Sequence, residues 1–150
     1  MSCDILLPMP SIKMTPQYSY PGELVVKRGI NGLGLFAAVP IKKADCIIEY
    51  VGDILTTDDE VNERSGQYLF EVSKKKTIDG SLRSNTARYI NHSCRPNCEV
   101  EIKKGQVFVY AKRNIKQGEE LCYDYGKDFW NEYIKPKGCR CQKCTTEMDK

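Results

Sequence analysis

Short apolar runs, rich in valine, isoleucine and aromatic residues, recur along most of the chain and are separated by turns. The clearest runs lie at 23–27, 46–52 and 67–72. Residues 100–113 contain two further runs joined at Gly105, which is the pattern of a β-hairpin. Many short strands at intervals of about 8–12 residues predict a mainly β domain with several small sheets.

Helical patterns are few and short. Residues 56–64 predict one helix, with Thr57 as its N-cap and Glu60 completing a capping box. Residues 128–134 are expected to form a single helical turn. The first 22 residues contain four prolines and little periodicity, so we expect an extended arm there.

Bulk composition narrows the class of protein. A chain of 150 residues with 41% hydrophobic and 29% charged residues fits one globular domain with a real core. No apolar run approaches about 18 residues, and no signal peptide is recognisable, so we expect neither a membrane span nor export. The net charge of +3 is too mild to favour direct nucleic-acid binding. Eight cysteines without an export signal predict an intracellular protein with reduced thiols.

The C-terminal sequence CRCQKC places Cys139, Cys141 and Cys144 within six residues. Such spacing favours a zinc site over a tail of free thiols, and structural zinc takes four ligands in a tetrahedron. We expect the fourth ligand from the segment RYINHSCRPNC, residues 88–98. That segment offers three candidates, Cys94, Cys98 and His92.

His92 is the only histidine, and its role has two interpretations from the sequence alone. On a strand it would share a face with Cys94, two residues on, and could pair with it. It could equally be fixed by packing and present its backbone to a ligand.

Tyr123 and Tyr125 would lie on one side of a regular strand. They could be half-buried strand tyrosines, or phenols that line a narrow pocket. The glycines in GINGLG, residues 29–34, let the backbone approach a ligand closely. That stretch matches neither a dinucleotide fingerprint nor a phosphate loop.

Taken in order, these motifs resemble the SET-domain protein lysine methyltransferases. GLGLFA, EYVG, TIDG, RYINHSCRPNC and EELCYDYG follow the order of that family, and CRCQKC resembles its post-SET zinc segment. The resemblance runs from about Lys27 to Cys144 and shows no cysteine-rich pre-SET region. It implies an N-terminal arm at 1–22, a SET domain at 23–126 and a post-SET segment at 127–150. The last cysteine comes two residues earlier than in many post-SET segments.

The resemblance implies small β-sheets around a pseudoknot, in which the NHSC segment passes through a loop closed near Tyr125. It also implies S-adenosylmethionine as methyl donor, a lysine side chain as acceptor and one structural zinc ion. A lysine desolvated in a narrow channel and repelled by a sulfonium loses its proton more easily, so no side-chain general base is required.

The resemblance also assigns residues by position. Donor binding is expected from Asn31, Gly32, Leu33, Gly34, Asn91, His92 and Tyr125. The catalytic group is Tyr125, with Tyr123 influencing the number of methyl groups and Tyr68 lining the lysine channel. Phe129 and Trp130 are expected in the wall of that channel. Zinc is expected at Cys94, Cys139, Cys141 and Cys144, which leaves Cys98 a structural role.

The implied function is methylation of a lysine, with one or two methyl groups added, on a basic histone tail. Alternatives are a lysine methyltransferase for non-histone proteins, a catalytically silent SET-like binding module, and a zinc-stabilised interaction protein. A histone substrate implies the nucleus and chromatin, of the host if the protein is microbial or viral.

Overall fold

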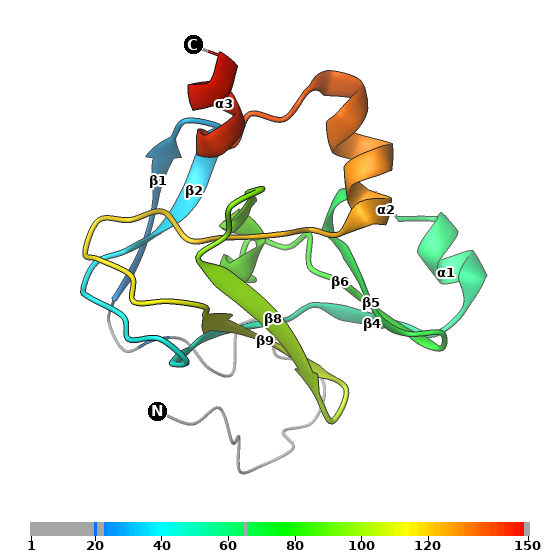
Figure 1. Cartoon of the computed structure of the whole chain (residues 1–150). Coiled ribbons are helices and arrows are strands. Elements are labelled where there is room, and N and C mark those ends of the chain that lie inside the picture. Colours follow the sequence, from blue (N-terminus) through cyan, green and yellow to red (C-terminus); the bar gives the residue numbers. More distant parts are fainter. Residues whose placement is uncertain (1–19, 21–22, 65, 149–150) are drawn as a thin grey trace. The chain divides into compact units, whose positions relative to one another are not determined.

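The computed structural model describes residues 20, 23–64 and 66–148, so the predicted arm at 1–22 falls almost wholly outside the described residues. The chain forms two compact units that alternate along the sequence. The first unit contains Asp45–Arg88 and Val100–Tyr110, and the second contains Glu23–Ala44, Tyr89–Glu99 and the chain from Ala111 onward. Most of the regular structure consists of short strands, which confirms the mainly β prediction (Figure 1).

The first unit is built on two three-stranded antiparallel sheets. One has the order β3 (Cys46–Tyr50), β9 (Gln106–Ala111) and β8 (Cys98–Lys103). Every residue of β3 is buried, because the strand reads as a continuous apolar run around one acid. The predicted hairpin of β8 and β9 is confirmed, and positive φ angles of 52° at Lys104 and 76° at Gly105 make its tight turn.

The second sheet of this unit has the order β4 (Asp53–Leu55), β6 (Lys76–Asp79) and β5 (Leu69–Ser73). Helix α1 (Asp58–Asn62) confirms the predicted capping box. Thr57 Oγ1 accepts the Glu60 N–H at 3.2 Å, and Glu60 Oε2 accepts the Thr57 N–H at 3.1 Å.

The strand predicted at 67–72 is wrong at its start. Gly66–Tyr68 forms a 3₁₀ turn, and β5 begins only at Leu69. The carbonyl of Tyr68 accepts the Tyr50 hydroxyl at 2.7 Å and the Gly80 N–H at 3.0 Å. These two partners hold Tyr68 in the turn that precedes the strand.

The second unit contains the hairpin of β1 (Leu24–Gly29) and β2 (Gly32–Ala37), whose turn has φ 81° at Gly32. It also contains a parallel pair of two-residue strands, β7 (Asn91–His92) and β10 (Cys122–Tyr123). Its core is formed by side chains that are at most 1% exposed: Leu35, Ala37, Ile41, Ile90, Ile115 and Leu121. The β7–β10 pair brings the two expected segments side by side, while the threading of a pseudoknot stays a prediction.

The C-terminal part of this unit is more helical than the sequence indicated. The predicted single turn is a continuous succession of α2 (Lys127–Phe129), a π-helix (Trp130–Ile134) and a 3₁₀ turn (Lys135–Lys137). Gly138, with φ 80°, ends it. A further helix, α3 (Gln142–Met148), was not predicted, and it winds the last cysteine onto a helical turn. Among the residues described, no helix is long and apolar enough to cross a membrane.

Candidate active site

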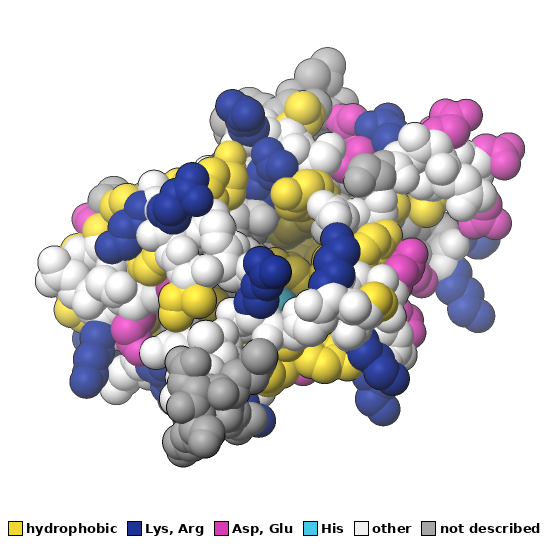
Figure 2. Space-filling view, turned by 90° about the horizontal axis from the view of Figure 1, so that it is seen from above, with side chains coloured by type: hydrophobic (Ala, Val, Ile, Leu, Met, Phe, Trp, Pro, Cys, Tyr) yellow, Lys and Arg dark blue, Asp and Glu magenta, His cyan; other side chains and the backbone are white. Residues whose placement is uncertain are grey.

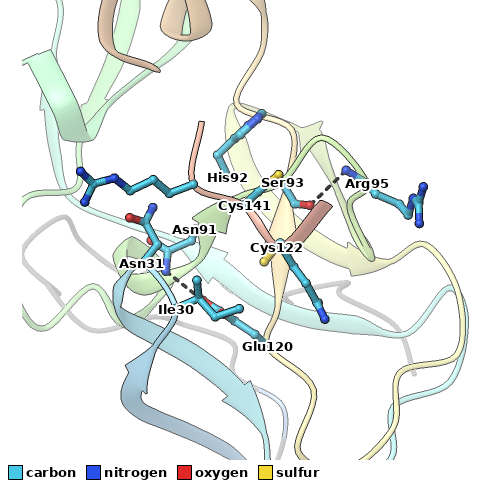
Figure 3. Close-up of a pocket in the computed structure, with 11 residues that line it drawn as sticks. Ile30, Asn31, Asn91, His92, Ser93, Arg95, Glu120, Cys122 and Cys141 are labelled. Carbon is cyan, nitrogen blue, oxygen red and sulfur yellow. Dashed lines mark hydrogen bonds between the residues drawn. The ribbon is translucent and has the colours of Figure 1, made fainter. Parts of the chain in front are cut away.

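A polar pocket lies in the second unit and is lined by residues from the tip of the β1–β2 hairpin and from the start of α3 (Figure 3). The predicted donor-binding residues Asn31, Asn91 and His92 line it, whereas Gly32, Leu33, Gly34 and Tyr125 are not among its lining residues. The rest of the wall was not predicted. It consists of Ile30, Ser93, Arg95, Glu120, Cys122, Arg140, Cys141 and Gln142.

Asn91 and Glu120 form the polar floor of this pocket. Asn91 Nδ2 donates to Glu120 Oε1 at 2.9 Å and to the Leu33 carbonyl at 3.0 Å, which ties β7 to the hairpin (Figure 3). Gly34 is buried against this pair, and a Cβ there would overlap Glu120 Oε1 and lie 2.9 Å from Glu120 Cδ. Gly34 therefore gives room for the carboxylate, which is a role that the glycine pattern alone did not indicate.

Glu120 was not predicted as a site residue. The sequence Glu119–Glu120–Leu121 gives no sign whether an acid lines a pocket or lies on the surface. Its strand position could have been found only from its pairing, since Glu120 lies opposite Phe36 in an antiparallel bridge. The residues that line the pocket thus include one acid, Glu120, and two exposed arginines, Arg95 and Arg140, although the Arg95 guanidinium is directed away from Asn91 and Glu120 (Figure 3). Such a wall suits a ligand that bears both positive and negative groups.

Another missed residue, Asn97, is 5% exposed and holds the β10 segment in place. Its Nδ2 donates to the Glu120 carbonyl at 2.8 Å, and its Oδ1 accepts the Cys122 N–H at 2.9 Å. A buried amide with both ends satisfied fixes the backbone on either side of Leu121. The start of β10 is therefore positioned by a side chain rather than by a long strand ladder.

The two predicted tyrosines lie side by side, with ring centroids 4.8 Å apart. The Tyr125 hydroxyl donates to the Ile90 carbonyl, and its backbone N–H donates to His92 Nδ1 at 3.1 Å. Burial raises the pKa of the Tyr123 phenol well above its ordinary value, so that hydroxyl keeps its proton at neutral pH.

Aromatic rings extend this pair into a cluster. The Phe129 ring meets the Tyr125 ring edge-on at 4.8 Å, and the Trp130 ring lies 5.6 Å from the His92 ring. Phe129 is the last residue of α2, and Trp130 is the first residue of the π-helix that follows it. The structure therefore brings both predicted channel residues to the neighbourhood of Tyr125.

His92 is held too firmly to act as a free base. Its side chain is 8% exposed, and Figure 2 shows the chain's only imidazole as no more than a small cyan area. Burial lowers the pKa of His92, against the opposing effect of the Asp124 carboxylate at 3.8 Å, so the ring is neutral at pH 7. Its one acceptor nitrogen, Nδ1, is already used by the Tyr125 N–H.

The four predicted zinc ligands converge: the sulfur atoms of Cys94, Cys139, Cys141 and Cys144 all lie within 4.8 Å of one another. Cys94 Sγ is 3.9 Å from Cys139 Sγ and 3.7 Å from Cys144 Sγ. Four thiolates about 2.3 Å from a tetrahedral zinc ion would be about 3.8 Å apart, so the donor set fits that ion. The shortened spacing before Cys144 does not prevent its joining the cluster.

The thiols of the cluster ionise unequally. Burial opposes ionisation of Cys141, but hydrogen bonds from the backbone N–H groups of Cys94 and Cys144 and from neighbouring thiols lower its pKa to about 6. Burial raises the pKa of Cys139 to about 11 and that of Cys94 well above its ordinary value. Of these three thiols, only Cys141 therefore ionises readily by itself, and a metal ion bound here would have to displace the protons of the other two.

The other two candidates for the fourth ligand lie outside the cluster. Cys98 is 1% exposed and its thiol contacts Asn97 Oδ1 at 3.3 Å, which fits the structural role expected for it. His92 does not join the four sulfurs, but its Nε2 lies 3.5 Å from Cys94 Sγ, so the pairing considered from the sequence is present.

Tyr68 belongs to the first unit, where its ring is covered by the Arg88 guanidinium at 4.4 Å. Its carbonyl takes part in the turn described above. A place for Tyr68 in a lysine channel stays a prediction.

Fold and site together define a mainly β protein with a polar pocket, an aromatic cluster and a cluster of four cysteines that could hold a metal ion. Comparison with known proteins supplies the family. The SET domain profile matches residues 32–126, and this chain therefore belongs to the SET-domain family, as the motifs indicated.

Its relatives include three histone-lysine methyltransferases from distant organisms. The chain is 40% identical over 132 residues to histone-lysine N-methyltransferase trr of Drosophila melanogaster, an alignment covering 80% of this chain and 5% of that protein. It is 38% identical over 133 residues to histone-lysine N-methyltransferase set1 of Dictyostelium discoideum, covering 80% and 9%. It is 43% identical over 108 residues to the H3 lysine-4 specific histone-lysine N-methyltransferase of Schizosaccharomyces pombe, covering 64% and 12%. The chain thus spans only a small fraction of these relatives' length.

Proposed function

We propose that this chain is an S-adenosylmethionine-dependent protein-lysine N-methyltransferase that adds one or two methyl groups to a histone lysine. One observation carries the proposal: a single short strand, β7, faces both the pocket and the aromatic cluster. Asn91 and His92 line the pocket, and His92 also holds the backbone of Tyr125. The relatives' names support the histone as substrate.

The polar pocket suits the charges of the methyl donor. S-Adenosylmethionine carries a sulfonium, an ammonium and a carboxylate, and it supplies the methyl group as an electrophile. The Glu120 carboxylate would complement the cationic groups, and Arg140, which also belongs to the lining, would supply positive charge for the carboxylate. Backbone groups of Asn31 to Gly34 and the Asn91 amide would complete the donor site.

The aromatic cluster suits the acceptor. A lysine has a pKa of about 10.4 in water, and it must lose a proton before its nitrogen can attack a methyl carbon. The rings of Tyr123, Tyr125, Phe129 and Trp130 would desolvate the ammonium and so lower its pKa. Because Nδ1 of His92 is occupied, water rather than His92 takes that proton. The nitrogen lone pair then forms the new C–N bond while the C–S bond breaks and leaves its electron pair on sulfur.

Zinc would be held by Cys94, Cys139, Cys141 and Cys144 and would have a structural role. Three residues of the pocket wall, Arg140, Cys141 and Gln142, belong to the segment that the cluster would fix. Metal binding would therefore complete one side of the donor site. A histone substrate would place the protein at chromatin, with the basic tail bound in an extended form along a strand edge.

The hydroxyl of Tyr125 provides the test. Tyr125→Phe removes the group that orients the reacting atoms, so turnover should fall by about a hundredfold or more, while donor affinity stays within about twofold. Calorimetry measures donor binding, and mass spectrometry of a histone panel incubated with labelled donor measures methyl transfer and maps the lysine. Methylation by this variant at the wild-type rate would contradict the assignment. Donor binding by the wild type without transfer to any protein would favour a silent SET-like module.

A further inference from the structure

The His92 side chain lies between the cysteine cluster and the tyrosine proposed for catalysis. Its Nε2 is 3.5 Å from Cys94 Sγ, and its Nδ1 is 3.1 Å from the backbone nitrogen of Tyr125. One imidazole therefore contacts both sites with its two nitrogens.

The hydrogen positions follow from the contacts. A backbone N–H can only donate, so Nδ1 must accept from Tyr125 and cannot itself carry a proton. The ring proton then sits on Nε2 and points toward Cys94 Sγ. A thiolate bound to a metal keeps lone pairs that accept such an N–H, and donors of this kind orient metal ligands.

Packing holds the ring in this orientation. The side chain is 8% exposed, the Tyr125 ring meets it at 5.5 Å and the Trp130 ring at 5.6 Å. The backbone of His92 is also fixed, because it pairs with Tyr123 in the parallel β7–β10 register. The Asp124 carboxylate lies 3.8 Å from Nδ1, and the thiol of Cys94 lies on the Nε2 side of the ring.

We propose that the His92 side chain is a positioning residue that couples the metal site to Tyr125, through Nε2–H to Cys94 Sγ and Nδ1 to the Tyr125 N–H. The proposal rests on the zinc site and the catalytic tyrosine of the proposed function. It assigns the imidazole a task separate from any contact of the His92 backbone with the methyl donor. Loss of metal would then disturb Tyr125 as well as the C-terminal segment.

Two substitutions separate the two contacts. In His92→Asn the amide oxygen can take the place of Nδ1 and accept from Tyr125, but no atom reaches Cys94. In His92→Gln the terminal amide can take the place of Nε2 and donate to Cys94, but no acceptor remains for Tyr125. The two variants therefore serve as matched controls for each other.

Zinc loss is measured first, as the rate of metal transfer to a chromogenic chelator in the absence of donor and substrate. His92→Asn should release zinc about tenfold faster than the wild type. His92→Gln should release zinc at a rate within about twofold of the wild-type rate. Methyl transfer is measured next with zinc-loaded protein. There His92→Gln should lose kcat at nearly unchanged KM, and His92→Asn should lose less. If His92→Asn and His92→Gln change the zinc-release rate equally and also change kcat equally, the proposed coupling is wrong. His92 then has only a packing role.

The wild-type protein gives a second test that needs no variant to fold. In protein loaded with cadmium-113, a proton on His92 Nε2 should be protected from solvent exchange and should correlate with the metal across Cys94. A proton on Nδ1, or no correlation, would overturn the proposal. If the wild type binds one zinc ion and methylates lysine while His92→Asn and His92→Gln give the same zinc-release and methyl-transfer rates, that result contradicts this inference alone. A wild type that does neither contradicts the proposed function itself.

Discussion

Gly34→Ala tests the floor of the proposed donor site most directly. The added Cβ would overlap Glu120 Oε1 and lie 2.9 Å from Glu120 Cδ and 3.3 Å from Asn91 Nδ2. The Glu120 carboxylate would have to turn away, because Gly34 is buried in β2 and its backbone is held by pairing with Lys27. That movement breaks the 2.9 Å hydrogen bond from Asn91.

The magnitude follows from the bond that is lost. A hydrogen bond to a charged group contributes about 1.5–3 kcal/mol, and the lower end applies here because Glu120 is only partly buried. If the displaced Glu120 carboxylate also forfeits one such bond to the methyl donor, the loss of about 1.5 kcal/mol raises the dissociation constant of the donor roughly tenfold. Gly29→Ala is the graded control, since its Cβ would come no closer than 3.1 Å to Glu120 Oε2 and should weaken donor binding less.

Calorimetric titration with S-adenosylmethionine measures the effect, and a double-mutant cycle gives its cause. If Gly34 is needed to make room for Glu120, adding Gly34→Ala to a Glu120→Ala protein should change donor affinity by less than about twofold. A tenfold loss in both backgrounds would refute this reasoning. The glycine would then act on the donor through its own backbone.

Three further predictions follow from individual contacts. Tyr123→Phe should shift the products toward higher methylation, because in the proposed site the Tyr123 hydroxyl would crowd the acceptor amine. An unchanged product distribution in mass spectra would contradict this. Thr57→Ala removes the acceptor of the Glu60 N–H and should lower the free energy of unfolding in urea by about 1 kcal/mol, while donor affinity stays the same. Hydrogen bonding to the Arg113 guanidinium, 3.0 Å away, lowers the pKa of Glu119 below 4.5. The stability from this pair is therefore present above pH 4.5 and is lost as the pH falls through the lowered folded-state pKa of Glu119. Glu119→Gln should destabilise the protein at pH 7, and its difference from the wild type should disappear as the pH is lowered through that pKa.

Local features were predictable because their physics is local. The capping box depends on Thr57 and Glu60, three residues apart, and the hairpin turn depends on Gly105. The cysteine cluster was also predictable, since three of its members are neighbours in sequence and the resemblance supplied Cys94 as the fourth. Each of these signals needs few residues and no knowledge of how distant strands pair.

The features that were missed depend on contacts between distant segments. Glu120 becomes part of the pocket because it meets Gly34 and Asn91, which are far from it in sequence. Asn97 is buried because β10 needs its amide, and Tyr68 leaves the strand because Tyr50 and Gly80 both bind its carbonyl. Propensity cannot indicate such pairings, because the residues involved look polar or strand-forming in isolation.

The segment Asn91–Cys94 shows how the family's most specific motif works as one unit. Asn91 reaches the hairpin and Glu120, His92 reaches Tyr125 and Cys94, and Cys94 joins the sulfur cluster. Successive side chains of a strand point to opposite faces, so consecutive positions can serve the pocket and the aromatic cluster at once. The strand is only two residues long, and one shift in register would misplace both side chains. The short spacing within Asn91–Cys94 is therefore what aligns the proposed donor pocket, Tyr125 and the cysteine cluster, more than the chemistry of any single side chain.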